Sequence, residues 1–243
     1  WCNALGWYRI AAALAAKTGR HKVGKNMTTP RRQVELLEKN RPRQERAKRT
    51  YESILVAAAE LLVEVGIERI STNLIAERAG ITVPALYRYF PNKYAVINAL
   101  GAELMDRQNL VFRDWLDTYL QEGNPQSLLS HIYEVLRATY DVTREQVGGI
   151  EIVQALRAVA PLQEVRLESH RMVSEQFAQF LGKLLQRPVD EELLIQARVT
   201  VDIGYSTVEM ALEDSALPVE RVLRQGARML EMYWRSSAGL PVT

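Results

Sequence analysis

One short stretch of the chain carries hydroxyl, aromatic and basic side chains whose types suit binding to nucleic acid. Thr72 and Thr82 are followed by Tyr87, Arg88 and Tyr89, three polar-tipped side chains in a row. Hydroxyl, phenol and guanidinium groups bind phosphate oxygens, and arginine also binds base edges in the major groove of duplex DNA. The residue types therefore favour a surface that contacts DNA rather than one that performs catalysis.

Two short helices joined by a tight turn are expected to position these side chains. We expect Thr72 to cap the first helix and Gly80, which tolerates a positive φ, to end it. Thr82 then caps a second helix that Pro91 stops. The inward-facing residues are apolar: Leu74, Ile75, Ala79, Ile81, Leu86 and Phe90. The pattern predicts a helix-turn-helix whose second helix enters the major groove, and the alternative is an ordinary helical corner.

Longer helices are predicted on both sides of this pair. The preceding helix ends at Gly66 and supplies core residues at helical spacing: Tyr51, Ile54, Leu55, Ala58, Leu61, Leu62 and Val65. The following helix begins at Lys93 and runs to about Tyr119, with a possible break near Gln108. It would connect the DNA-contacting part to the rest of the chain.

The stretch closely resembles the signature of the tetracycline repressor-like (TetR) family. The resemblance covers roughly residues 45–95 and is carried by Ile75-Ala76, Ala79-Gly80-Ile81-Thr82, Leu86-Tyr87-Arg88-Tyr89-Phe90 and Asn92-Lys93. It implies an all-helical homodimer with an N-terminal DNA-binding domain and a divergent C-terminal domain that senses a small molecule.

The resemblance also implies roles for individual residues. Phosphate contacts are implied for Thr72, Tyr87, Tyr89 and Lys93, and base-edge contacts for Val83, Pro84 and Ala85, with Asn73, Thr82 and Arg88 on the same surface. Pro84 departs from a frequent glycine and Ala85 from a common threonine. Because Ala85 lacks a hydroxyl, we expect shape and methyl contacts to carry more of the sequence preference.

Basic residues precede the helix-turn-helix. Arg43, Arg46 and Lys48 adjoin it and are predicted to bind phosphate, whereas Arg31 and Arg32 fit a solvated tail equally well. The net charge is +2, but it is +4 over residues 27–94 and −7 over residues 95–243. This asymmetry suits a basic front half that faces a polyanion.

Residues 1–26 differ from the rest of the chain. They hold five basic and no acidic residues, and Met27 is followed by a plausible protein start. We interpret residues 1–26 as upstream or otherwise non-native sequence, and the alternative is a targeting segment on the Ala-rich stretch that carries Arg9, Lys17 and Arg20.

The remainder of the chain is predicted to be helical, with no strand alternation. Helices are expected over 126–140, 143–159, 162–186, 190–212 and 218–235. We therefore predict an all-α fold with an extension and basic arm over residues 1–44, a helix-turn-helix domain over 45–95, and an effector-binding and dimerisation domain over 96–243.

Two of these helices carry seams that could join two copies of the chain. Small or apolar residues recur at spacings of three and four: Leu194, Ala197, Val201, Gly204 and Val208, then Val222, Gly226, Met229 and Tyr233. Two helices from each copy would form a four-helix interface and would separate two DNA-contacting helices by about one DNA turn, ~34 Å. The alternative is that these faces are buried within one chain.

An effector pocket is implied by the family resemblance. Candidate wall residues are Phe112, Trp115, Tyr119, Tyr133, Met172, Phe177 and Phe180, with Arg157 or His170 as polar anchors. Aromatic residues at helical spacing belong to a core more often than to a ligand cage, so both interpretations stay open.

Little in the sequence indicates catalysis. The three histidines His21, His131 and His170 lie far apart and lack neighbours at metal-ligand spacing, so we expect no metal and no cofactor. The single cysteine, Cys2, fits a reducing cytoplasm, and no apolar run approaches the ~20 residues that span a bilayer. We predict a ligand-responsive repressor that binds a palindromic operator in double-stranded DNA as a homodimer. The alternatives are an activator, an effector-independent regulator and an all-α enzyme.

Overall fold

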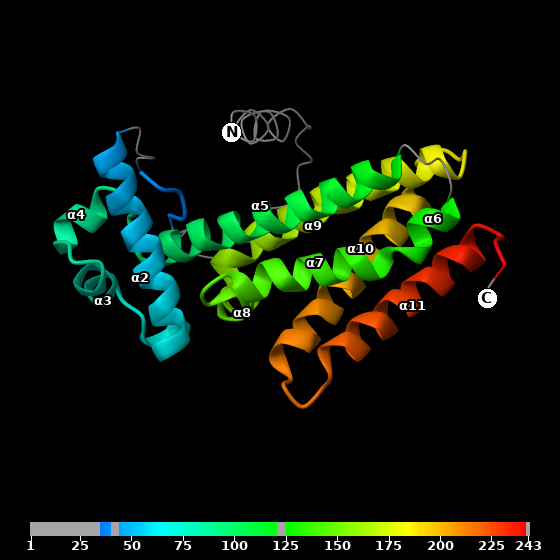
Figure 1. Ribbon diagram of the computed structural model, residues 1–243. Helices are drawn as coiled ribbons and strands as arrows, with labels where there is room; N and C mark the ends of the chain where they lie inside the picture. The colour runs from blue at the N-terminus through cyan, green and yellow to red at the C-terminus, as the bar shows by residue number, and fades with distance from the viewer. Residues whose placement is uncertain (1–34, 40–43, 121–124, 242–243) are drawn as a thin grey trace, which may run out of the picture. The chain divides into compact units, whose positions relative to one another are not determined.

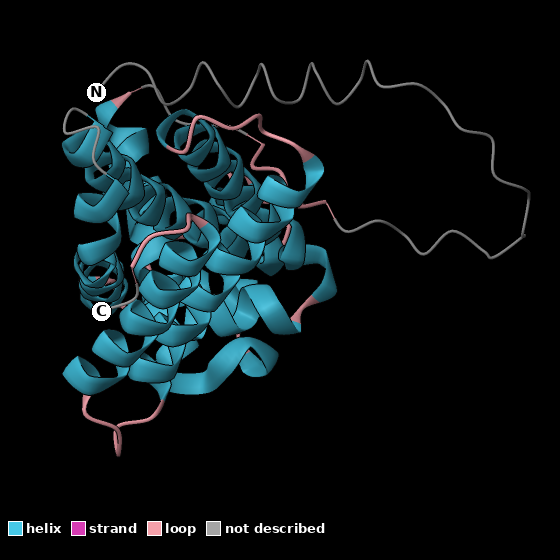
Figure 2. Cartoon of the chain, turned by 90° about the vertical axis from the view of Figure 1, so that its right-hand side faces the viewer, coloured by secondary structure: helices cyan, strands magenta, loops and turns pink. Residues whose placement is uncertain are grey.

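The computed structural model describes residues 35–39, 44–120 and 125–241, and every regular element within these ranges is a helix (Figure 2). This confirms the predicted all-α fold class. The predicted N-terminal extension, residues 1–26, and the basic residues Arg31, Arg32 and Arg43 lie outside the described residues.

Ten α-helices and one 3-10 helix follow one another in the described ranges (Figure 1). They are α2 (Glu45–Arg69), α3 (Thr72–Arg78), α4 (Val83–Tyr87), α5 (Lys93–Leu120), α6 (Pro125–Ser130), α7 (Ile132–Glu145), α8 (Gly149–Ala158), η1 (Ala160–Leu162), α9 (Gln163–Leu184), α10 (Glu191–Glu213) and α11 (Val219–Ser237).

The first hydrophobic core lies beneath α2, α3 and α4, which we call the three-helix unit. Its largest fully buried side chains include Ile54, Leu62, Ile75, Leu86 and Phe90. This core also takes in the first part of α5, up to Met105, together with α8 and η1. The apolar packing thus continues past residue 95, where the sequence pattern placed a domain boundary.

Helix α8 packs against the three-helix unit through its contact with α2. Gly148, which precedes it, has a φ of 67°, and a Cβ atom there would lie 2.9 Å from the carbonyl oxygen of Ala59 in α2. A Cβ on Gly101 of α5 would lie 2.7 Å from Cδ2 of Leu156 in α8. Glycines thus let α8 approach both α2 and α5 closely.

The second core joins the far part of α5 to α6, α7, α9, α10 and α11. Aromatic rings dominate its centre, where Phe112, Trp115, Phe177 and Trp234 pack with centroid distances of 5.7–6.5 Å. Figure 1 shows α5 running from the three-helix unit alongside α9 into this second group of helices. One helix therefore contributes to both cores.

Several predicted helix limits need correction. The possible break in α5 near Gln108 is wrong, because the helix runs unbroken from Lys93 to Leu120. The segment predicted as one helix over 126–140 is two, α6 and α7, which meet at His131. The next helix begins at Gly149 rather than near Thr143, because Gly148 adopts a left-handed conformation and α7 runs on to Glu145.

The capping of α3 also differs from the prediction. The hydroxyl of Ser71, not that of Thr72, accepts the amide of Leu74 at 3.2 Å. Leu74, predicted to face inward, is exposed, since Ile75 and Ala76 form the buried face of this helix. Gly80 has the expected positive φ of 66°, and Gly66 of 73° kinks α2 before its last turn.

Candidate DNA interface and the polar layer behind it

Helix α4 presents the surface predicted to face DNA. The Thr82 hydroxyl caps it by accepting the amide of Ala85 at 3.4 Å, as expected from the sequence. Leu86 is fully buried, whereas Thr82, Pro84, Tyr87 and Arg88 are exposed on the outer side. One buried leucine thus fixes the rotation of the helix and leaves the polar side chains outside.

The turn brings two predicted phosphate contacts into direct contact with each other. The hydroxyl of Thr72, at the start of α3, lies 3.1 Å from the phenol oxygen of Tyr87, at the end of α4. Asn73 follows Thr72 and is exposed on the same helix. Two side chains fifteen positions apart therefore form one hydroxyl pair on the exposed side of the three-helix unit.

Two members of the predicted base-contacting group are only partly accessible. Val83 packs against the first core and Ala85 is half-buried, while Pro84 is exposed. Tyr89 is also half-buried, with its ring 6.3 Å from that of Tyr51 in an edge-on arrangement. Fewer of these side chains are consequently accessible to DNA bases than the sequence pattern suggested.

Lys93 has backbone partners that the sequence did not predict. Its ammonium donates to the carbonyl oxygens of Ile67 at 3.0 Å, Glu68 at 3.3 Å and Ile70 at 3.0 Å. These are carbonyls at the C-terminal end of α2, where a helix lacks internal partners and favours a cation. The three N–H donors of this lysine thereby join the start of α5 to the end of α2.

The described part of the basic arm packs beside α4. The amide of Lys39 donates to the carbonyl of Tyr89 at 2.7 Å, and the side-chain amide of Asn92 donates to the carbonyl of Glu35 at 2.8 Å. Arg46 and Lys48 are exposed at the start of α2, and Lys48 forms an ion pair with Glu45 at 2.7 Å. The arm thus begins next to the candidate DNA surface.

An ion-pair cluster behind α3 was not anticipated from the sequence. The guanidinium of Arg78 binds both carboxylate oxygens of Glu64, at 2.8 and 2.6 Å, and reaches Glu60 at 3.2 Å. The hydrogen bonds that its guanidinium donates to Glu64 and Glu60 hold the pKa of Arg78 above its ordinary value. The spacing of the two glutamates on α2 was the available signal, since residues four apart share one helix face.

The predicted effector residues lie in different surroundings. Phe112, Trp115, Tyr119 and Phe177 are buried against one another in the second core, and Met172 is exposed. Their assignment as cavity walls stays a prediction. Arg157 pairs with Glu209 at 2.7 Å instead of facing a cavity.

Between the two cores lies a polar layer formed by Gln108 and Asn109 of α5, Thr143 of α7 and Ser169 of α9. The side-chain amide of Gln108 donates to Thr143 Oγ1 at 2.8 Å, and the Ser169 hydroxyl donates to Asn109 Oδ1 at 2.8 Å. All four residues are buried. Apolar packing is interrupted at these positions of α5, α7 and α9.

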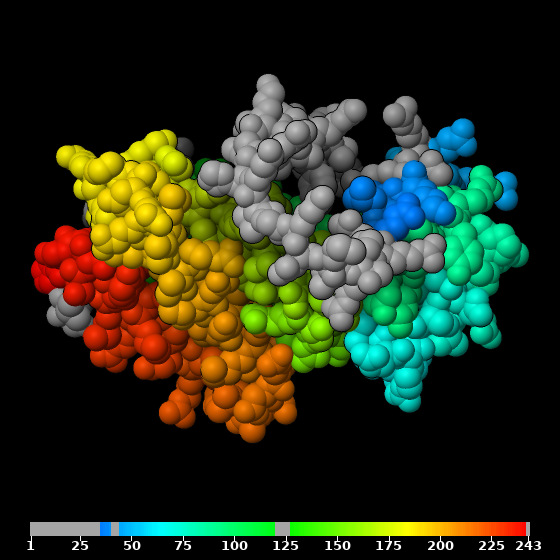
Figure 3. Space-filling view, turned by 180° about the vertical axis from the view of Figure 1, so that it is seen from behind, coloured from blue at the N-terminus to red at the C-terminus, as the bar shows by residue number. Residues whose placement is uncertain are grey.

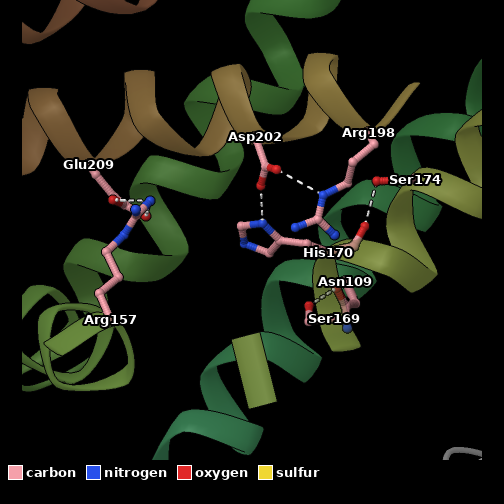
Figure 4. Close-up of polar contacts among 8 residues, drawn as sticks. All are labelled: Asn109, Arg157, Ser169, His170, Ser174, Arg198, Asp202 and Glu209. Carbon is pink, nitrogen blue, oxygen red and sulfur yellow. Dashed lines mark hydrogen bonds and ion pairs between the residues drawn. The ribbon is translucent and has the colours of Figure 1, made fainter. Parts of the chain in front are cut away.

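A charged cluster borders this layer (Figure 4). His170 Nδ1 lies 2.5 Å from Asp202, which also accepts from Arg198 at 2.8 Å. Burial lowers the pKa of His170 to about 4 even though Asp202 opposes the shift. Burial acts to raise the pKa of Asp202, but hydrogen bonds from His170 and Arg198 outweigh it and hold that pKa below its ordinary value. His170 is therefore neutral near pH 7 and donates to a carboxylate.

The predicted dimer seam needs correction. Ala197, Val201, Gly204, Val208 and Gly226 are buried within the chain, so their small side chains serve packing among α7, α10 and α11. A Cβ on Gly226, for example, would lie 2.4 Å from Cγ2 of Thr207. Of the remaining predicted residues, Leu194, Met229 and Tyr233 are exposed and Val222 is half-buried.

The opposite face of the same two helices is apolar and exposed. Its residues recur along α10 and α11: Ile195, Val199, Ile203 and Met210, then Met229, Met232 and Tyr233. Figure 3 shows the orange surface of α10 next to the red surface of α11 on one side of the molecule. A row of large apolar side chains in water is unfavourable for a solitary chain.

No group of three or more histidine, cysteine, aspartate or glutamate side chains is placed to hold a metal ion in the described ranges. No helix in those ranges is both long and apolar enough to cross a membrane.

Comparisons with known proteins agree with this architecture. A family model described as bacterial regulatory proteins, tetR family, matches residues 54–100. The tetracycline repressor protein class D of Escherichia coli is 40% identical over 63 residues, which are 26% of this chain and 29% of that protein. The HTH-type transcriptional regulator SrpR of Pseudomonas putida is 29% identical over 161 residues, or 65% of this chain and 70% of SrpR.

Solved structures extend the likeness of fold to both helical groups. A TetR-family transcriptional regulator from Streptomyces coelicolor superposes with a TM-score of 0.52 at 23% identity, covering 78% of this chain and 98% of that one. GusR of Salmonella enterica superposes with a TM-score of 0.56 at 20% identity, covering 78% and 95%. At these identities the likeness concerns the fold.

The fold and the exposed α4 surface define a two-part, all-helical protein of the helix-turn-helix class. The matched signature lies in the same helices that form the candidate DNA surface. Within these helices the chain is similar to the tetR family of bacterial regulatory proteins, whose model matches residues 54–100. The match to the tetracycline repressors spans less than a third of their length, so their own activity is not transferred to this chain by it.

Proposed function

We propose that this protein is a DNA-binding transcriptional regulator, most simply a repressor, that binds an inverted-repeat operator as a homodimer. The observation that carries the proposal is the α4 surface, where Thr82, Pro84, Tyr87 and Arg88 are exposed around a fixed buried leucine. A helix held this way can place its first turn against base edges. Both the family match and the basic charge of residues 27–94 support it.

Within that surface the roles divide by accessibility. Thr72, Tyr87, Arg46 and Lys48 would bind phosphates, and Pro84 and Arg88 would face the bases with Ala85 at the edge of the contact. Lys93 would act on DNA indirectly, by holding α5 against α2, because its three donors already have carbonyl partners. This replaces the phosphate contact expected for it.

The homodimer would use the exposed apolar face of α10 and α11. Two copies would bury Ile195, Val199, Ile203 and Met229 in a four-helix interface and place two α4 helices on one side of a duplex. Burial of apolar side chains stabilises such an association by ~25 cal/mol per Å² before the cost of association is subtracted.

Ligand response is proposed on the basis of the family and the position of the polar layer between the cores. A ligand that changes the layer would change how α5 and α8 support the three-helix unit. Coupling of this kind amounts to ~1–3 kcal/mol, a 5- to 150-fold change in DNA affinity.

Selection of bound fragments from a random DNA pool tests the proposal. We expect enrichment of a short inverted repeat by the full chain, with affinity that falls steeply as salt rises. The variant Arg46→Ala should lower the slope of log affinity against log salt by about one, and Arg113→Ala, an exposed arginine on the far part of α5, should leave it unchanged. Absence of any enrichment at low salt would contradict the proposal.

A further inference from the structure

A pocket lies between α11 and the junction of α6 and α7. Its volume is about 270 Å³, close to the lower end of the ~300–1,000 Å³ that ligand-binding pockets occupy. Leu129, Ser130 and Tyr133 line one side, and one flank of α11 lines the other. Helix α11 packs against both α6 and α7 (Figure 1), so the two sides of the pocket are held together. The pocket is large enough for a small organic molecule.

The α11 side of the pocket carries a row of charged side chains. Arg224, Arg228, Glu231 and Arg235 follow one another at intervals of four, three and four residues, so they share one face of the helix. Arg224 pairs with Glu220 at 2.6 Å, and Arg235 pairs with Glu231 at 2.8 Å. Arg228 is exposed and forms no ion pair with any residue that the structure describes. The charged row therefore favours an anion at Arg228.

Two contacts across the pocket hold the outer arginines of this row. The guanidinium of Arg224 lies 4.3 Å from the centroid of the Tyr133 ring on α7. Arg235 is only 9% exposed, and its Nη2 donates to Ser130 Oγ at 3.1 Å. Arg228 lies between these two positions in the row. Its neighbours in the pocket are thus fixed by protein contacts, whereas its own guanidinium can bind a ligand.

Apolar side chains line the rest of the pocket. They are Leu129, Ala227 and Met232. Leu129 and Ala227 belong to the second core, and Met232 is exposed. An apolar group placed against them would be removed from water together with their surfaces, which is favourable. The lining therefore suits a ligand that has both a charged end and an apolar body.

We propose that this pocket binds a small organic carboxylate with an apolar body. The carboxylate would accept two parallel N–H bonds from the guanidinium of Arg228, and the body would lie against Leu129, Ala227 and Met232. The existing volume is far above the ~10–15 Å³ that one water molecule needs. The ligand can therefore enter without displacing the arginine that binds it.

The pocket and the proposed dimer interface use different sides of α11. At 100° per residue, Met229 and Tyr233 of the exposed apolar face lie roughly 130° and 170° around the helix from the centre of the charged row. Met232 lies between the row and that face and borders both. A second copy of the chain would therefore leave the charged row accessible to a ligand.

Titrations of the full chain followed by NMR, at constant ionic strength, test the site without DNA. The probes are benzoate, benzamide, which has the same shape without the charge, and acetate, which lacks the apolar body. We expect benzoate to bind with a dissociation constant of ~1 mM and about tenfold more tightly than either analogue. Equal affinities for benzoate and benzamide, or for benzoate and acetate, would overturn the inference.

The variant Arg228→Gln locates the binding. It should weaken benzoate binding about tenfold and leave thermal unfolding unchanged, because Arg228 is exposed. The control Arg113→Gln changes an exposed arginine of α5 that does not line the pocket, and it should bind benzoate as the parent does. Normal benzoate binding by Arg228→Gln would refute the site. None of these outcomes depends on the regulatory function proposed above.

Discussion

The ammonium of Lys93 lies 3.0 Å from the carbonyl oxygen of Ile70, the C-cap residue of α2. Two further carbonyls of the same helix end, those of Ile67 and Glu68, surround it. The first side chain of α5 is thus a cap for the last turn of α2. The relationship links a helix of the three-helix unit to the helix that continues into the second core.

Replacing Lys93 by methionine tests whether this cap or a phosphate contact matters. We expect the variant to lose about 1–3 kcal/mol in the free energy of unfolding, because carbonyls near the core lose charged donors. Its DNA affinity should fall for all sequences, with no change in the salt slope. Urea unfolding and fluorescence titrations at several salt concentrations give both quantities. A slope lower by about one with normal stability would assign Lys93 to phosphate.

The hydroxyl pair of Thr72 and Tyr87 can be separated by a double-mutant cycle. Both side chains are accessible, so Thr72→Val and Tyr87→Phe should change the free energy of unfolding by less than about 1 kcal/mol. Each should weaken DNA binding, and the double variant should be weakened by less than the sum, because the hydroxyls orient each other. Strict additivity in the measured binding energies would show that they act separately.

The exposed face of α10 can be tested by a single charge. Ile203→Glu should convert the proposed homodimer to monomers at micromolar concentration in sedimentation experiments, because an ionised carboxylate would be buried at the interface. Leu110→Glu places the same charge on an exposed apolar position of α5 and is the matched control. A dimer that survives Ile203→Glu and dissociates with Leu110→Glu would place the interface elsewhere.

Two glycines with the same backbone conformation allow two costs of adding a Cβ atom to be separated, the steric clash with a neighbour and the strain of a positive φ. Gly80 and Gly148 have φ values of 66° and 67°, but a Cβ would meet nothing within 4 Å at Gly80 and the Ala59 carbonyl at 2.9 Å at Gly148. Gly80→Ala should cost about 1 kcal/mol and Gly148→Ala distinctly more. Thermal unfolding of the two variants measures the difference. Equal losses of stability would mean that α8 shifts easily to make room for the added methyl group.

Acid should destabilise the protein through His170. Because burial holds the folded-state pKa at about 4 against an ordinary 6.5, the unfolded chain binds the proton more tightly. The contribution of His170 to stability is complete above pH 6.5 and declines by up to about 3 kcal/mol as the pH falls to 4. The facing groups are Asp202, Arg198 and the stacked ring of Tyr205 from α10 and Arg166 from α9.

Urea unfolding between pH 7 and 4 measures this decline in the free energy of unfolding. The variant His170→Gln should make the decline smaller, and the glutamine amide can still donate to Asp202. An NMR titration of the imidazole gives the folded pKa directly, without relying on the variant. An imidazole that titrates near 6.5 would contradict the expected behaviour.

Local signals made the three-helix unit predictable. Gly80 and Thr82 mark helix ends by local constraints that act within a few residues, and each lies where the pattern placed it. Helix α4 ends at Tyr87, ahead of the stop expected at Pro91. The adjacent hydroxyls of Ser71 and Thr72 could not be ranked in this way. Either can cap a helix, and packing of Ile75 selects the register.

Features that depend on the packing of helices distant in the chain could not be predicted from the sequence. The small residues Ala197, Gly204 and Gly226 fit an interface between copies as well as a close contact within one chain, and only the arrangement of α7, α10 and α11 decides. The partners in the polar layer are 35 positions apart for Gln108 and Thr143 and 60 for Asn109 and Ser169. The spacing of residues within one helix cannot identify a hydrogen-bond partner on another helix.

The continuity of α5 has a mechanical consequence. Its 28 residues extend for about 42 Å at 1.5 Å per residue, and neither proline nor glycine kink interrupts them. Because α5 has no kink, it cannot bend at its middle to absorb a displacement at one end. A small rotation of the helix near Phe112 would therefore produce a sideways movement at Lys93. A contact made at any point along the far part of α5 would therefore reach Lys93 through the same unbroken helix.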